Sequence, residues 1–173
     1  MGTTVRCVVT AKGVDGKSFI AKDQQIAMGP LGIFDFWATD QMPASIEGHN
    51  ILDGKPTRLE PSTNGTLFRF FEIPPVQTNL STEEANQKAA DAFAAAGATH
   101  CRVDTNRNPM MHTTKSIDYV VVLKGEVTLL LDKDEVNLKP FDAIVQRGTN
   151  HYWINKGKEP ALLMGVLVDA KEI

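Results

Sequence analysis

Two histidines and one carboxylate are the residues of this chain whose types and spacing best suit chemistry. His112 and Asp118 lie in the segment 112–125, and His151 lies in the later segment 148–155. An imidazole binds metal ions when neutral and moves protons near neutral pH, and a carboxylate does the same work as an anion. Such a set predicts either a metal site or an acid/base site.

The spacing of these residues predicts a bend between them. Alternate residues of a strand point the same way, so His112, Thr114 and Asp118 share a parity. Six residues of straight strand would separate His112 from Asp118 by roughly 20 Å, whereas two ligands of one metal ion lie roughly 3–4 Å apart. The chain must therefore turn at Lys115 and Ser116 if the two side chains act together.

The elements that would position these residues are mostly short strands. Alternating or apolar segments recur at intervals near ten residues with Gly, Pro, Asn or Asp between them, which is typical of a sandwich or barrel. The first two segments flank a Gly-containing turn and predict a hairpin, and the pair around Lys124 and Gly125 predicts another. The predicted strands span 5–11, 17–22, 33–39, 65–75, 117–123, 126–131, 135–138, 143–146, 151–155 and 161–168.

One helix interrupts this pattern, at residues 81–96. Ser81 and Glu84 have the spacing of a capping box, alanines fill the body, and Gly97 can end the helix. Because alanine offers little side chain to a core, we expect this helix to be a surface insertion that lies against the outside of the sheet.

The bulk composition excludes several functions. The 173 residues suit one domain. A formal net charge of −3 gives no sign of the basic face that nucleic-acid binders carry, and no apolar segment approaches the roughly 20 residues that span a membrane. Two cysteines, Cys7 and Cys101, are too few for a disulfide framework, so we expect buried thiols in a reducing, cytoplasmic protein.

The order of the candidate residues resembles the two motifs of the cupin superfamily, G-x5-H-x-H-x3-4-E-x6-G and G-x5-P-x-G-x2-H-x3-N. His112 and Gly125 match the first motif, in which Asp118 stands for the glutamate and Thr114 for the second histidine. In the second motif Gly148, His151 and Asn155 match, whereas Asp142 replaces the leading glycine and Gln146 replaces the proline.

This resemblance implies an all-β, single-domain cupin with a jelly-roll β-barrel. One domain would cover residues 1–173. N-terminal strands and an irregular extension would occupy 1–65, and the barrel would occupy 66–170 with the helix at about 81–96 inserted.

The resemblance also implies a ligand set for one divalent metal ion, formed by His112, Asp118 and His151. Fe, Zn, Mn and Ni all suit such a site, and a metal-free site is the alternative. Thr114 in place of the second histidine would leave a position open for water or substrate.

Four residues are candidates for catalysis: His112, His151, Lys115 and Arg69. Arg69 alternates with apolar neighbours, and facing inward it would bind a carboxylate or enolate through its planar guanidinium; a place on the subunit surface is the alternative. The expected substrate-binding residues are Thr114, Phe68, Phe70, Val120, Val122, Trp153 and Asn155, a set that favours an apolar or aromatic substrate.

Three functions fit a cupin of this kind. The first is an enzyme of proton-transfer chemistry, a dehydratase, isomerase or decarboxylase acting on a carbonyl-containing metabolite. The second is a non-haem iron dioxygenase with a 2-His-1-carboxylate site, and the third is a non-catalytic cupin that binds a small ligand. The resemblance further implies a homodimer, and we expect no nucleic-acid or membrane partner.

Overall fold

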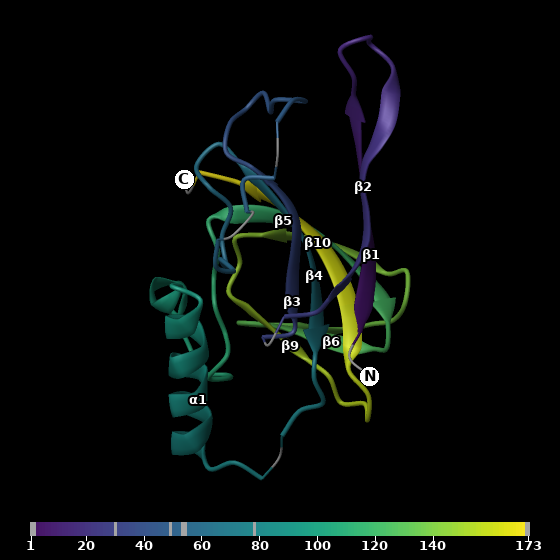
Figure 1. Ribbon diagram of the computed structural model, residues 1–173. Coiled ribbons are helices and arrows are strands. Elements are labelled where there is room, and N and C mark those ends of the chain that lie inside the picture. Colours follow the sequence, from purple (N-terminus) through teal and green to yellow (C-terminus); the bar gives the residue numbers. More distant parts are fainter. Residues whose placement is uncertain (1–2, 30, 49, 53–54, 78, 172–173) are drawn as a thin grey trace.

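The computed structural model describes residues 3–29, 31–48, 50–52, 55–77 and 79–171 (Figure 1). In this part of the chain, strands dominate and one α-helix is inserted between the fourth and fifth of them. The elements are β1 (Thr4–Lys12), β2 (Ser18–Ala27), β3 (Ile33–Thr39), β4 (Thr66–Ile73), α1 (Thr82–Ala95), a 3-10 helix η1 (Thr99–Cys101), β5 (Ser116–Lys124), β6 (Val127–Leu131), β7 (Glu135–Leu138), β8 (Ala143–Arg147), β9 (His151–Ile154) and β10 (Ala161–Asp169).

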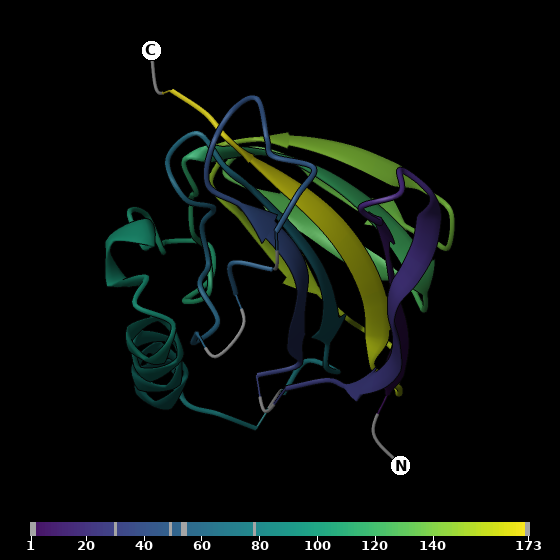
Figure 2. The same cartoon turned by 45° about the horizontal axis from the view of Figure 1, so that its top comes forward.

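Two antiparallel sheets build the barrel. Five strands pair in the order β3-β4-β10-β5-β8, and three pair in the order β7-β6-β9. The sheets face each other (Figure 2). Between them, one core cluster joins Val120, Val122 and Leu163 of the first sheet to Leu129 and Trp153 of the second. The prediction of an all-β jelly-roll barrel is therefore confirmed.

The N-terminal hairpin is also confirmed. β1 and β2 pair antiparallel, with a register shift between Val9 and Thr10. They form a separate two-stranded sheet that projects beyond the barrel, on the side opposite α1 (Figures 1 and 2).

The second predicted hairpin, around Lys124 and Gly125, is wrong. β5 belongs to the five-stranded sheet and β6 to the three-stranded sheet, so the chain crosses from one sheet to the other between them. Gly125 makes this crossing at φ +77°, and a Cβ built there would lie 2.9 Å from the Cβ of Ala161. A two-residue turn and a sheet crossing both need glycine, which is why the sequence pattern did not separate them.

Helix α1 has the predicted ends but a different position. Ser81 and Glu84 form the capping box, and Gly97 follows the helix at φ +64°. The helix does not lie against the outside of the sheet as expected. Phe93 is buried with Cys101 against residues that lead into the barrel. Ala89 and Phe93 are the buried residues of the helix, and Phe93 is the large one. Among all the residues that the structure describes, no helix is long and apolar enough to cross a membrane.

The outer face of the five-stranded sheet is apolar. Phe34, Phe36, Phe68 and Phe70 form a cluster of half-buried rings with centroids 4.8–6.1 Å apart. Tyr119 on β5 is 49% exposed nearby in the same sheet. An apolar sheet face of this kind suits contact with a second copy of the chain. The homodimer stays a prediction, and this is the face on which we expect the copies to meet.

We expect Gly125→Ala to destabilise the fold more than Gly16→Ala. Both glycines have nearly the same positive φ, +77° and +76°, but a Cβ at Gly16 has nothing within 4 Å. The backbone cost of about 1–2 kcal/mol is shared, and the contact with Ala161 should add roughly 1–3 kcal/mol at Gly125 alone. Urea unfolding of both variants measures the difference, and equal losses of stability would contradict the close approach at the crossing.

We expect Tyr119→Lys to convert a dimer into a monomer without loss of secondary structure. A lysine charge on the apolar face would be desolvated if two copies met there. Val136→Lys is the matched control, since Val136 is also 49% exposed but lies on β7 in the other sheet. Sedimentation velocity measures the mass. A wild-type monomer, or equal dissociation by both variants, would contradict this interface.

Candidate active site

A cavity of about 450 Å³ lies between the barrel and helix α1. Eight polar side chains line it, and the rest of its wall is apolar. Ile73, Val120 and Trp153 come from the strands, and Phe93 and Ala96 come from the helix side. The polar side chains in the wall are Arg69, His112, Thr114, Asp118 and His151, together with Glu72, Tyr152 and Lys88 of the helix.

His112 and His151 face each other across an isolated antiparallel bridge. Each backbone N–H donates to the other residue's carbonyl oxygen, at 3.0 Å in both directions. The two imidazole rings lie side by side with centroids 4.4 Å apart. The bridge therefore brings together two motifs that are almost 40 residues apart in the sequence.

The hydrogen bonds of the two rings fix their tautomers. Nδ1 of His112 lies 3.0 Å from the carbonyl oxygen of Met110, and Nδ1 of His151 lies 3.0 Å from that of Thr149. A carbonyl oxygen only accepts, so each Nδ1 carries the hydrogen. Each Nε2 is left with a lone pair and makes no hydrogen bond within the described part of the chain. Metal-binding histidines are commonly oriented in this way.

Burial keeps both imidazoles neutral. It lowers the pKa of His112, and it lowers the pKa of His151 to about 3, with a smaller contribution from the neighbouring His112. The pair can therefore accept hydrogen bonds or bind a cation through Nε2. Neither ring holds a proton well at neutral pH, which makes them weak general bases.

Asp118 differs from the two histidines in that its pKa is raised and not lowered. Burial raises the pKa of its carboxyl group to about 6, against the opposing effects of a hydrogen bond from Ser116 and the charge of Arg69. The Ser116 Oγ lies 2.5 Å from Asp118 Oδ1 and 2.9 Å from Thr114 Oγ1. A carboxyl group of this pKa can both accept and release a proton near neutral pH.

Thr114, Ser116 and Asp118 form a chain of hydrogen bonds, and the protonation state of Asp118 decides its direction. Ser116 has one hydroxyl proton and cannot donate to both neighbours. When Asp118 is ionised it only accepts, so Ser116 donates to Asp118. When Asp118 is protonated it can donate to Ser116, Ser116 then donates to Thr114, and the hydroxyl proton of Thr114 is available to the cavity.

Arg69 faces inward, as one of the two alternatives predicted. It is 4% exposed, and its guanidinium group pairs with Asp35 at 2.8 Å. The same group donates to the carbonyl oxygens of Leu59, at 3.3 Å, and Arg58. Because these partners occupy its donors, Arg69 acts on the cavity through its charge and is not a free bidentate clamp for substrate.

The predicted metal ligands are not gathered as a set of three. The ligand atoms of His112, Asp118 and His151 do not all lie within 4.8 Å of one another, and Asp118 is held by Ser116. The carboxylate does not complete a metal site with the two histidines as it is placed. The metal assignment stays a prediction.

Several predicted site residues do line the cavity. Val120, Trp153 and Thr114 are in its wall together with the two histidines, Asp118 and Arg69. The backbone bends at Lys115, as the spacing required. Lys115 itself is exposed and is not part of the cavity wall.

Four predicted substrate-binding residues lie elsewhere. Phe68 and Phe70 alternate with the inward Arg69 and so point to the outer face. Val122 is fully buried in the barrel core, below the cavity. Asn155 is buried and its side-chain amide donates to the carbonyl oxygens of Ile73 and Glu159, both at 2.8 Å, so it holds a loop closed.

Sequence reasoning missed three residues of the site. Ser116 has the parity of Thr114 and Asp118, and that signal could have assigned it to the chain of hydroxyl groups. Phe71 shares the parity of Arg69 and lines the cavity. Phe93 on α1 lies 5.1 Å from the His112 ring between centroids. No local pattern indicates that contact, because it depends on how the helix docks.

Residues 100–168 match the family model described as "Cupin domain". That match contains His112 and His151 and covers strands β5 to β9 and nearly all of β10. This part of the chain is a cupin domain. The expectation that rested on the two motifs is thereby confirmed.

The cupin resembles several curated fungal proteins. "Phomopsin biosynthesis cluster protein C'" of Diaporthe leptostromiformis is 48% identical over 66 residues, which are 37% of this chain and 35% of that protein. "Cupin-domain-containing oxidoreductase srdD" of Neurospora crassa is 30% identical over 115 residues, 62% and 58% of the two chains. "Cupin-domain-containing oxidoreductase virC" of Hypocrea virens is 40% identical over 67 residues, 36% and 34%. The matches span less than two thirds of each relative.

We expect Asp118→Asn to change how stability depends on pH. The carboxyl group has a pKa of about 6 in the fold and about 4 in an unfolded chain. The folded protein therefore binds more protons between these values, and the stability that depends on this group falls as pH rises from about 4 to about 6. Relative to wild type, the Asn variant should gain up to about 3 kcal/mol between pH 4 and pH 7.

Urea unfolding at both pH values measures this change. Ser116→Ala is the companion variant, since it removes the bond that lowers the pKa of Asp118 and should extend the fall in stability to higher pH. A constant difference between wild type and Asp118→Asn across the range would contradict the raised pKa.

Proposed function

We propose that this cupin is a small-molecule enzyme that transfers protons on an apolar, carbonyl-containing substrate, with Asp118 as the acid/base group. The observation that carries the proposal is the carboxyl group of Asp118, whose pKa is raised to about 6 and which lines a mainly apolar cavity beside two neutral imidazoles. A perturbed carboxyl group in such a cavity is a common sign of an acid/base site.

The carboxylate of Asp118 would begin the reaction. It takes a proton from the carbon next to the substrate carbonyl, and the C–H electron pair forms a C=C bond while the carbonyl pair moves to oxygen. The product of this step is an enolate and a protonated Asp118. Return of the proton to another carbon completes an isomerisation. Alternatively, the enolate expels a β-hydroxyl group, which takes the proton from Asp118 and leaves as water.

The hydroxyl chain would respond to that step. Protonated Asp118 donates to Ser116, Ser116 donates to Thr114, and the Thr114 hydroxyl can then donate to the enolate oxygen. Ser116 then supports the Thr114 donor as negative charge develops on the substrate, which is when such a donor stabilises the transition state most. The buried guanidinium group of Arg69 adds positive charge near Asp118.

The histidine pair would orient the substrate. Each Nε2 can accept a hydrogen bond from a phenol or enol hydroxyl group, and both histidines line the cavity. If the pair holds a divalent ion instead, that ion would supply Lewis-acid polarisation of the carbonyl oxygen. His112 and His151 are then positioning groups in both cases, and the proton transfer stays with Asp118.

The size and wall of the cavity favour a substrate with an aromatic or extended apolar body. A cavity of about 450 Å³ is within the usual range for small-molecule sites. Trp153, Phe71 and Val120 offer apolar contacts to such a body. Relatives whose names refer to biosynthesis clusters, including phomopsin and oryzines, support a role in small-molecule metabolism.

Oxidation is the second candidate function. Relatives named as cupin-domain-containing oxidoreductases favour it. It would require Asp118 to leave Ser116 and join the two Nε2 atoms around an iron ion, in the 2-His-1-carboxylate arrangement. The position of Asp118 in the hydroxyl chain favours proton transfer over this arrangement.

Deuterium exchange into 4-phenyl-2-butanone, a neutral aromatic ketone, tests the proton transfer. We expect the enzyme to accelerate exchange next to the carbonyl group, with a rate that rises as pH passes about 6 and Asp118 ionises. Asp118→Asn should lower the rate by about 100-fold or more. Thr114→Val should lower the rate by about 10-fold, while Thr114→Ser should retain it. NMR of the ketone in D2O measures all three.

Tyr119→Phe is the control, because Tyr119 lies on the outer face of the sheet, away from the cavity wall. Exchange at the solvent rate in wild type, or an Asp118→Asn variant as active as wild type, would contradict the proposal. Repeating the assay under argon separates the second candidate. Oxygen consumption that requires iron and is lost in His112→Ala would favour oxidation.

A further inference from the structure

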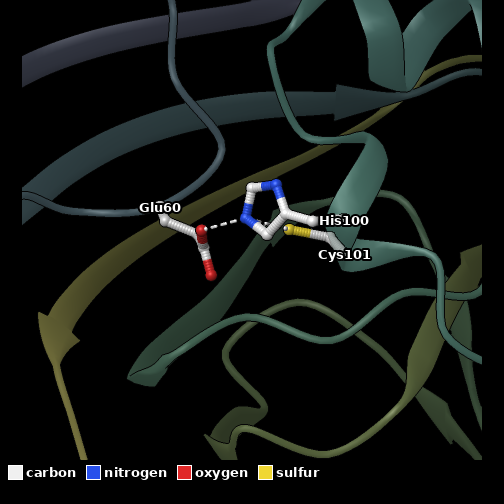
Figure 3. Close-up of side chains that lie close together, drawn as sticks. All are labelled: Glu60, His100 and Cys101. Atoms are coloured by element: carbon white, nitrogen blue, oxygen red, sulfur yellow. Dashed lines mark hydrogen bonds and ion pairs between the residues drawn. The ribbon is translucent and has the colours of Figure 1, made fainter.

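A second group of chemically active side chains lies outside the barrel, formed by Glu60, His100 and Cys101. Figure 3 shows the Glu60 carboxylate reaching the His100 ring, with the Cys101 sulfur beside it. Glu60 Oε2 is 2.7 Å from His100 Nε2, and Cys101 Sγ is 3.5 Å from the same nitrogen. All three ligand atoms lie within 4.8 Å of one another, and no other group of three or more His, Cys, Asp or Glu does so among the residues described here.

Three separate segments bring these groups together. His100 and Cys101 are adjacent in η1, directly after α1, and Glu60 belongs to the loop before β4. The second carboxylate oxygen of Glu60 accepts from the backbone N–H of Lys115 at 2.8 Å. The backbone N–H of Thr113 donates to the Cys101 carbonyl oxygen at 2.9 Å. The cluster thus connects the loop, the end of the helix and the segment that leads into β5.

The distances suit a tetrahedral zinc ion. With a Zn–S bond of about 2.3 Å and a Zn–N bond of about 2.0 Å, the sulfur and nitrogen of one ion lie roughly 3.5 Å apart. That is the observed separation of Sγ and Nε2. The carboxylate oxygen is about half an ångström too close to Nε2, since it now forms a hydrogen bond. Glu60 is 22% exposed and can adjust by that amount.

The donor types also select the ion. A thiolate and an imidazole favour Zn²⁺ and similar borderline ions over Mg²⁺ and Ca²⁺, which prefer oxygen. Two anionic ligands, the thiolate and the carboxylate, would balance the charge of the dication. The His100 side chain is 61% exposed, so water can reach a fourth position.

We propose that Glu60, His100 and Cys101 form a zinc site that fixes the wall of the cavity. On binding, the S–H bond of Cys101 breaks, its proton passes to solvent and a Zn–S bond forms, with no change of oxidation state. Leu59, next to Glu60, lines the barrel cavity together with Phe93 and Ala96 of the helix region. The ion would therefore hold loop and helix in register over the cavity, independently of which reaction takes place inside it.

Cobalt(II) titration of the reduced, untagged chain tests the site directly. A thiolate–cobalt bond gives a near-ultraviolet charge-transfer band, and the barrel histidines offer no sulfur, so this band reports a thiolate site and not the barrel histidines. We expect one equivalent of cobalt to produce the band. Cys101→Ser should abolish it, and His100→Ala, an exposed substitution that preserves the fold, should weaken binding at least 10-fold.

Two controls make the result specific. Cys7→Ser removes the other buried free thiol and should leave the band unchanged, and His112→Ala should leave it unchanged as well. Zinc at about 100 times its Kd should raise Tm by about 5–10 °C in wild type and Cys7→Ser but not in His100→Ala. No band in wild type, a band that survives Cys101→Ser, or a band that is lost in Cys7→Ser would overturn the proposal.

Discussion

The backbone bridge between His112 and His151 is the constraint on which the site depends. Two reciprocal hydrogen bonds of 3.0 Å join His112, in the segment that leads into β5, to the first residue of β9. The bridge crosses from the strand that enters the five-stranded sheet to the three-stranded sheet, so the barrel is closed at the point where the chemistry is concentrated. Opposed residues in such a bridge have neighbouring side chains. The pairing of the two imidazoles is therefore a consequence of how the barrel closes, and it needs no direct bond between the rings.

The rest of the polar site follows from what happens on either side of that bridge. After His112 the chain bends at Lys115 and enters β5 with Ser116 and Asp118 facing inward. Before His151, Gly148 turns at φ +58°, where a Cβ would lie 3.2 Å from the carbonyl oxygen of Thr114. The turn of one motif thus packs against the backbone of the other. A larger residue at that turn would separate the two segments, and the hydroxyl chain with them.

The sequence allowed the fold to be predicted well and the site only in part. The two cupin motifs, found in the correct order, identified the barrel. The alternation of side chains along a strand correctly grouped His112, Thr114 and Asp118. Parity tells which residues share a face of a strand, but it does not tell which face points inward or how deep a residue lies. Phe68 and Phe70 were therefore assigned to the cavity although Arg69 between them is the inward residue. Val122 has the correct parity and lies too deep.

How deep a side chain lies, and which element covers it, depend on long-range packing, which no local sequence pattern encodes. The same limit explains Asn155, whose motif position suggested the cavity although its amide closes a loop. It also explains α1. An alanine-rich helix with a good capping box looks like a passive surface element, because helix propensity describes the helix alone and not its docking partner. Its one large buried side chain, Phe93, is the contact that matters.

The cover that α1 provides sets the electrostatics of the cavity. Burial is the largest cause of the pKa shifts of His112, His151 and Asp118, and these shifts make the imidazoles neutral and the carboxyl group a proton donor and acceptor near neutral pH. Phe93 packs against the His112 ring, and the guanidinium carbon of Arg102 lies over the Phe93 ring, 6.0 Å from its centroid. A helix that moved away would admit water, and all three pKa values would return toward those of exposed groups. The inserted helix therefore contributes no reacting group, yet the protonation states of the site depend on its position.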